Sequence, residues 1–218
     1  MTDRRHRLLA VLALAALTAP LEAGAAKPVP PIPADPAIAY GQRETSGNAT
    51  MDNVWVMNYD GQRKTRLLTA DSASNGYRDA SLDPTGAAIA ASRAASPTRD
   101  LWAWDILKNT ANGSVTPTAV NRRMLARDAS CSSDPMQAIC QYEYGDSAWS
   151  PSGMNIAAAL NPSFGDPSSG MLRVWTWTNA ARTTGSYETL YTPPEQAQIW
   201  SPSWSPDGTQ VVSAADRS

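Results

Sequence analysis

The sequence predicts an all-β protein, and within that class a β-propeller made of four-stranded antiparallel blades. Three observations predict this fold: a recurring turn element with proline and glycine, recurring strands centred on tryptophan, and strands that are apolar on both faces. Four short strands that recur at about 40–50 residues are typical of a propeller blade. We expect about three blades and the first hairpin of a fourth.

The turn element occurs as LDPTG (82–86), WSPSG (149–153) and WSPDG (204–208), and a small, β-tending run follows each copy. Proline at the second position presets φ, aspartate can bond to its own backbone, and glycine tolerates a left-handed exit. Asp83 and Ser205 are interpreted as turn formers for the same reason. The other residues expected to form these turns are Pro84, Gly86, Pro151, Gly153, Pro206, Asp207 and Gly208.

The tryptophan strands are NVWVMNYDG (53–61), DLWAWDI (100–106) and RVWTWT (173–178). In the second of them, Trp102 and Trp104 alternate with Leu101 and Ala103, so both faces are apolar. Such a strand must be covered on both sides, which a blade between two neighbouring blades provides. The aromatic residues expected in the blade cores are Trp55, Trp102, Trp104, Trp149, Trp175, Trp177 and Trp204. The alternative role for paired tryptophans is a stacking platform for sugars.

The repeats divide the folded part, residues 37–218, into units at about 37–70, 77–127 and 144–193, with a partial unit at 200–218. Closed propellers have about four to eight blades, and an incomplete one leaves open sheet edges. We therefore expect this chain to be the N-terminal part of a longer propeller. The alternative is a short chain that completes its propeller by self-association.

Residues 1–25 have the pattern of a cleavable signal peptide. A cationic head at 4–7 precedes the apolar run 8–19, and Ala23-Gly24-Ala25 supplies small residues for cleavage. The apolar run is too short to span a bilayer. The proline-rich stretch 26–36 is expected to be an extended leader. The mature protein is therefore predicted to be periplasmic or secreted.

The two cysteines, Cys131 and Cys140, lie nine residues apart. In an oxidising compartment this spacing favours a structural disulfide that closes a short loop. A redox-active pair is the alternative, but it would normally have the C-x-x-C spacing.

The composition argues against most catalytic chemistry. The formal net charge is −2, so no basic surface for nucleic acid is expected. The one histidine, His6, lies in the signal peptide, which leaves the mature chain without imidazole for base catalysis or metal binding. No G-x-S-x-G, phosphate-loop or dinucleotide motif occurs. We expect no catalytic residue, cofactor or metal; the acids Asp128, Asp134, Glu143 and Asp146 lack calcium-loop spacing and are expected on a solvated loop face.

The motif W-S-P-D-G at 204–208, with V-W-V-M-N-Y-D-G at 54–61 and T-R-L-L-T at 65–69, resembles the propeller repeat of the TolB family of periplasmic proteins. A weaker copy lies at 149–153. The resemblance covers most of residues 37–218 and implies a propeller that binds a protein partner. The N-terminal α/β domain of that family has no counterpart here. Similar blades occur in the propeller domains of prolyl oligopeptidase-type peptidases.

The sequence thus predicts an exported, non-catalytic scaffold for protein–protein interaction. One alternative is the propeller portion of a secreted peptidase whose catalytic domain follows this segment. A third is a propeller that binds carbohydrate, suggested by the eight tryptophans. A nucleophile motif in downstream sequence would favour the peptidase, and binding to a polysaccharide would favour the third function.

Overall fold

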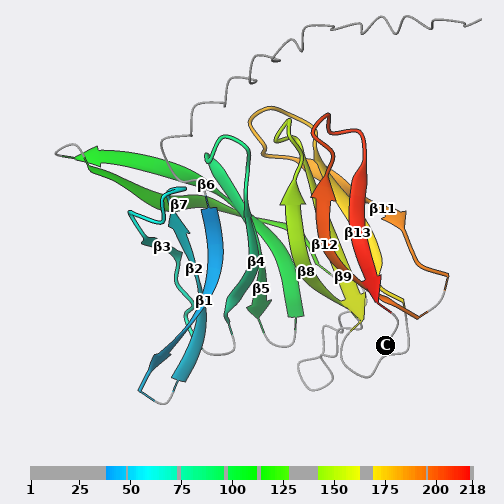
Figure 1. Ribbon diagram of the computed structural model, residues 1–218, viewed down its shortest axis with the longest axis horizontal. Helices are drawn as coiled ribbons and strands as arrows, with labels where there is room; N and C mark the ends of the chain where they lie inside the picture. Colours follow the sequence, from blue (N-terminus) through cyan, green and yellow to red (C-terminus); the bar gives the residue numbers. More distant parts are fainter. Residues whose placement is uncertain are drawn as a thin grey trace, which may run out of the picture. The chain divides into compact units, whose positions relative to one another are not determined.

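The computed structural model describes residues 38–47, 49–72, 75–95, 98–111, 114–127, 142–162, 169–194 and 196–216. Within these ranges the chain is all-β, with thirteen strands and no helix. The strands form four antiparallel sheets, none of which closes into a barrel (Figure 1). No helix of the described part is long and apolar enough to cross a membrane.

The strands follow one another through the sheets in chain order. The first sheet contains β1 (Ile38–Ser46), β2 (Ala49–Met57) and β3 (Thr65–Leu68). The second contains β4 (Tyr77–Leu82), β5 (Ala88–Ala95), β6 (Thr98–Ala111) and β7 (Ser114–Ala126). The third contains β8 (Tyr142–Trp149), β9 (Asn155–Pro162), β10 (Met171–Trp177) and β11 (Gly185–Tyr191). The fourth contains β12 (Gln198–Trp204) and β13 (Val211–Asp216).

The three proline-glycine turns connect the first two strands of the second, third and fourth sheets. Their glycines Gly86, Gly153 and Gly208 have φ values of 65°, 68° and 72°, a region that only glycine occupies without strain. Each glycine N–H donates to the carbonyl of the residue three positions earlier. Each copy of the turn element therefore forms the first hairpin of a new sheet.

Each pair of consecutive sheets encloses one apolar cluster. Val54 and Ile89 belong to the cluster of the first and second sheets, and Leu101 and Tyr144 to that of the second and third. Ile199 joins the fourth sheet to the third. Within β6, Leu101 and Ala103 face the third sheet, whereas Trp104 and Ile106 face the first. The prediction that the tryptophan strand is buried on both faces is confirmed.

The tryptophan that precedes a turn also bonds to the preceding sheet. The indole N–H of Trp149 donates to the Ser81 carbonyl at 3.1 Å, and that of Trp204 donates to the Ala148 carbonyl at 3.0 Å. Both acceptors lie on the first strand of the preceding sheet, one residue before its turn element. The same contact therefore repeats from the second to the third sheet and from the third to the fourth.

Strands β6 and β7 are longer than the sequence led us to expect. The tryptophan strand was predicted at 100–106, but β6 continues to Ala111. Strand β5 pairs with β6 only as far as Asp105, beyond which β6 pairs with β7 alone. The two strands therefore extend as a ribbon past the rest of their sheet (Figure 1). A two-stranded ribbon needs only cross-strand bonds, so the polar residues at 108–110 did not end it.

Candidate functional site

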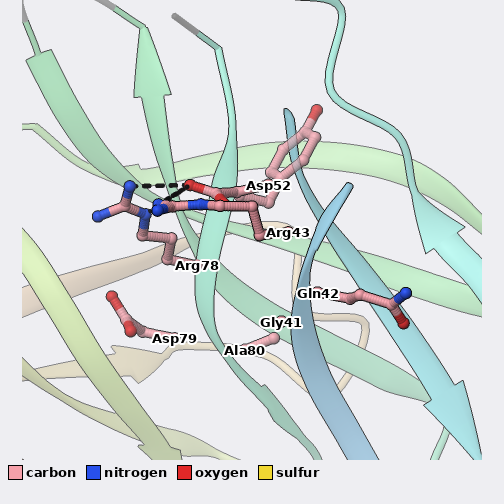
Figure 2. A pocket seen from close by; sticks show the side chains of 8 residues that line it. Gly41, Gln42, Arg43, Asp52, Arg78, Asp79 and Ala80 are labelled. Atoms are coloured by element: carbon pink, nitrogen blue, oxygen red, sulfur yellow. Dashed lines mark hydrogen bonds and ion pairs between the residues drawn. The ribbon is translucent and has the colours of Figure 1, made fainter. Parts of the chain in front are cut away.

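A pocket of about 520 Å³ lies where β1 and β2 of the first sheet meet β4 of the second (Figure 2). Its lining residues are Gly41, Gln42, Arg43, Asp52, Tyr77, Arg78, Asp79 and Ala80. The β1–β2 hairpin places Arg43 directly opposite Asp52, β1 also supplies Gly41 and Gln42, and β4 supplies residues 77–80. This pocket brings together more charged side chains than any turn element, and we take it as the candidate site.

Two arginines share one carboxylate in this pocket. Arg43 Nε donates to Asp52 Oδ1 at 2.8 Å, and Arg78 Nη2 lies 2.8 Å from Asp52 Oδ2. Figure 2 shows both guanidinium groups converging on Asp52. The hydrogen bond from Arg43, together with that from Arg78 and the charges of both, lowers the pKa of Asp52. Since the Arg43 and Arg78 side chains are 63% and 45% exposed, each keeps donors for a ligand.

Replacing Asp52 by asparagine is expected to destabilise the protein at pH 7 by about 1 kcal/mol, the upper value for a partly exposed ion pair. A carboxyl whose pKa is lowered by folding stabilises the folded state above its unfolded pKa of about 4 and loses this effect as pH falls. The difference from wild type should therefore shrink below about pH 4 in urea unfolding curves. A constant difference between pH 3 and 7, or an equal effect in the exposed control Asp216→Asn, would contradict it.

Asp79 lies beside this cluster in an unusual conformation. Its φ is 54°, in the left-handed region that residues other than glycine rarely adopt. Burial, and secondly the charge of Asp146, raises the pKa of its carboxyl. Ser92 Oγ donates to its Oδ2 at 3.1 Å. Strained backbone and a buried acid in one residue are features that gather at functional sites.

The strain at Asp79 belongs to a repeated irregularity. The first strands of the second, third and fourth sheets each shift register, after Arg78, Tyr144 and Trp200. Successive irregularities contact one another: the Ser201 N–H donates to Asp146 Oδ2 at 2.7 Å, and Ser147 Oγ donates to the Asp79 carbonyl at 3.2 Å. A smaller pocket of about 140 Å³ lies along them and also includes Asp79.

Replacing Asp79 by asparagine is expected to stabilise the protein at pH 7, raising Tm by about 2 to 4 °C. An acid whose pKa is raised by folding destabilises the folded state once pH exceeds its unfolded value, and asparagine removes that charge. Asparagine also tolerates a positive φ. Thermal unfolding should show the gain at pH 7 and none at pH 3. Asp79→Ala, which loses the bond from Ser92, should be less stable; a gain that is equal at both pH values would contradict the charge argument.

The structure does not gather the sequence-predicted residues into this pocket. The turn residues lie at the connections between strands, away from its lining. Trp104, Trp149 and Trp177 are buried, and Trp55, Trp102, Trp175 and Trp204 are half-buried. Trp102 and Trp104 stack with ring centroids 6.4 Å apart, but burial of Trp104 leaves no open sugar platform there.

Of the four acidic residues expected on a loop, two lie in a strand and two lie outside the described residues. Glu143 and Asp146 lie in β8, half-buried, and pair with Arg99 and Ser201, so the prediction of a solvated loop face was wrong for these two. They were misplaced because β8 begins at Tyr142, seven residues before the tryptophan element. Asp128, Asp134, Cys131 and Cys140 lie outside the described residues. Among the described residues, no group of three His, Cys, Asp or Glu side chains could hold a metal ion.

Sequence analysis did not single out Arg43, Asp52, Arg78 or Asp79. One signal was present: Arg43 and Asp52 lie symmetrically about Gly47 and position 48, so opposite charges face each other across a hairpin. Nothing local marks Arg78, because it reaches Asp52 only through packing of the second sheet on the first.

Comparison with known proteins shows no family. No family model matches the chain, and no curated protein matches it. Among solved structures, one similar chain is described as the structure of a Mycobacterium tuberculosis puromycin-hydrolyzing peptidase, with a TM-score of 0.44 and 19% sequence identity. The match covers 80% of this chain and 26% of that chain, so this chain spans about a quarter of the peptidase's length.

Proposed function

We propose that this chain is an exported, non-catalytic β-propeller scaffold that binds protein partners in a TolB-like manner. The observation that carries the proposal is the Arg43–Asp52–Arg78 cluster at the mouth of a pocket between two sheets. Two exposed guanidinium groups that share one carboxylate retain planar N–H donors that Asp52 does not use. Such donors recognise the carboxylates of a polypeptide.

The repeated contacts between sheets support the propeller. Each consecutive pair encloses an apolar cluster, and the indole bond from Trp149 to the second sheet is repeated by Trp204 on the third. A contact that repeats from sheet to sheet arranges sheets by one repeated rotation, as in propellers. In this proposal the sheets are blades at about 37–70, 77–127 and 144–193, and the hairpin at 200–218 begins a fourth.

Export and the absence of catalysis are proposed from the sequence. Residues 1–25 and the expected Cys131–Cys140 disulfide lie outside the described residues. Removal of the signal peptide removes the one histidine. A pocket whose exposed polar groups are the guanidinium donors of Arg43 and Arg78 suits recognition better than turnover.

A photo-crosslinking amino acid at Gln42, in the pocket lining, tests the proposal in the native host. We expect a discrete protein adduct that is lost in the double variant Arg43→Gln/Arg78→Gln. The matched control places the same group at Thr189, exposed on β11, and should give no such adduct. Equal adducts from both positions, or no adduct from Gln42, would argue against the scaffold. Hydrolysis of aminoacyl amides by the purified chain would replace it with a peptidase function.

A further inference from the structure

We infer that the outer edge of β1 is a docking site for an extended acidic polypeptide segment, which adds to the first sheet as its innermost strand. This inference rests on the proposed binding function and names the kind of partner that the pocket takes. It is drawn from a comparison of the first sheet with the other sheets of the same chain.

Among the described residues, the first sheet has no counterpart of the strand with which each of the other sheets begins. The tryptophan strands β2, β6 and β10 correspond, and the strands that precede them in their sheets are β1, β5 and β9. In the second and third sheets, β5 and β9 pair on their other edge with β4 and β8. Among the described residues, β1 pairs with β2 alone. Within the described part of the chain, one edge of β1 therefore has no partner strand, and such an edge can template a further strand.

The candidate pocket lies where that strand would run. It is lined by β1, β2 and β4, and has a volume of about 520 Å³. The smaller pocket, beside β9 and β12, measures about 140 Å³ and is lined in part by residues 143–146 of β8, the strand that has no counterpart beside β1 among the described residues. A Cβ built on Gly41 would meet no atom within 4 Å, so space is open against the β1 backbone.

Charge identifies an acidic segment as the occupant. In the third sheet, Asp146 of the innermost strand accepts hydrogen bonds from the N–H and Oγ of Ser201 in the next sheet. Asp79 stands at the position of Ser201, each four residues before the first residue of its turn, Asp83 or Ser205. In a strand added beside β1, a residue that corresponds to Asp146 would therefore face the register shift of β4 after Arg78. An acid at this position would lie beside Arg78 and Arg43. Figure 2 shows the Asp79 carboxylate apart from these two guanidinium groups, which leaves them to the ligand.

The chain's own strands are poorer occupants than a partner. Among the described strands, β4, β8 and β12 are the first strands of their sheets. A second copy could offer β12 without breaking up a four-stranded sheet, whereas β4 and β8 each belong to one. Strand β12 carries Ser201 and Pro202 at the irregularity, with no acid for the arginines. We therefore assign the edge to a segment of a partner polypeptide with an aspartate or glutamate opposite Arg78.

A peptide that copies β8, YEYGDSAW (142–149), is the probe, because β8 already fills this place in the third sheet. Fluorescence anisotropy should show saturable binding to the full chain. The double variant Arg43→Gln/Arg78→Gln should weaken binding at least about tenfold, which is the effect of losing one hydrogen bond to a charged group. Arg122→Gln removes an exposed charge remote from the pocket lining and should leave binding unchanged. A peptide with asparagine for its aspartate should bind the wild type as weakly as the original binds the double variant.

Hydrogen exchange separates strand addition from simple charge attraction. The peptide should slow exchange in β1, residues 38–46, and leave the open-edged strand β11 unchanged. Binding without protection of β1, or equal affinity for the double variant, would overturn the inference. A concentration-dependent dimer that excludes the peptide would assign the edge to a second copy and overturn it too. If the peptide fails while the Gln42 cross-link persists, the scaffold stands and only strand addition is lost.

Discussion

Replacement of Asp83 by alanine is expected to lower the free energy of unfolding by about 3 to 5 kcal/mol, the range for breaking a buried ion pair. The Asp83 side chain is fully buried, and its Oδ2 accepts from Arg182 Nη2 at 3.0 Å across the second and third sheets. Its Oδ1 accepts the N–H groups of Ala87 and Ala88, which close the turn. Alanine would leave a half-buried cation and two backbone donors without their acceptor.

Serine at position 83 is the matched control, because the other two turns use it. Ser150 Oγ and Ser205 Oγ each accept the N–H five residues further on, as Asp83 does from Ala88. Asp83→Ser should therefore recover about 1 to 2 kcal/mol relative to alanine, the value of a restored hydrogen bond at a buried donor. Adding Arg182→Met should cost only about 1 kcal/mol more in urea unfolding, for the contact with the Trp149 ring, because its ion-pair partner is already gone. Equal stability of the alanine and serine variants would contradict the turn argument.

Truncation of Trp149 to alanine is expected to cost about 3 to 5 kcal/mol, the range for a large buried aromatic residue. The ring is 7% exposed and packs in the cluster between the second and third sheets. Arg182 lies over it at 4.9 Å from the ring centroid. The change therefore removes core volume, an indole hydrogen bond to Ser81 and a cation–π contact together.

Phenylalanine at position 149 isolates the hydrogen bond. Trp149→Phe keeps most of the ring packing but leaves the Ser81 carbonyl without its donor, so about 1 kcal/mol should be lost. Trp204→Phe removes the equivalent bond to Ala148 from a half-buried ring and should cost a similar amount. Circular dichroism should follow unfolding, since tryptophan fluorescence changes with the substitution itself. A loss in Trp149→Phe as large as in Trp149→Ala would mean that the bond, and not packing, dominates.

Features that depend on a few neighbouring residues could be predicted from the sequence. The turns at Gly86, Gly153 and Gly208 follow from proline geometry and from the left-handed conformation that glycine permits. Burial of β6 on both faces follows from the apolar alternation of DLWAWDI. The extent of β6 and β7 did not follow, although Asn-Gly at 112–113 is itself a hairpin signal. The tryptophan strand was expected at 100–106 only, because a ribbon without a covered face needs no apolar pattern to mark its continuation.

The candidate site could not be predicted because it depends on packing between sheets. The distance in sequence between Asp52 and Arg78 is 26 residues, and their contact requires the β1–β2 hairpin to lie against β4. The raised pKa of Asp79 depends on burial and on Asp146 of the third sheet. No sequence motif indicates its positive φ or its burial, because the register shift of β4 that produces them is not marked by any characteristic residue.

The sheet-to-sheet bonds of Trp149 and Trp204 have a consequence for how the molecule comes apart. Apolar clusters join each consecutive pair of described sheets, and indole bonds join the second sheet to the third and the third to the fourth. Stability in such an array is carried by nearest-neighbour couplings, so opening one sheet weakens only those beside it. The second and third sheets, coupled on both sides, should open last. Opening should start instead at the hairpin β12–β13, and proceed inwards one sheet at a time.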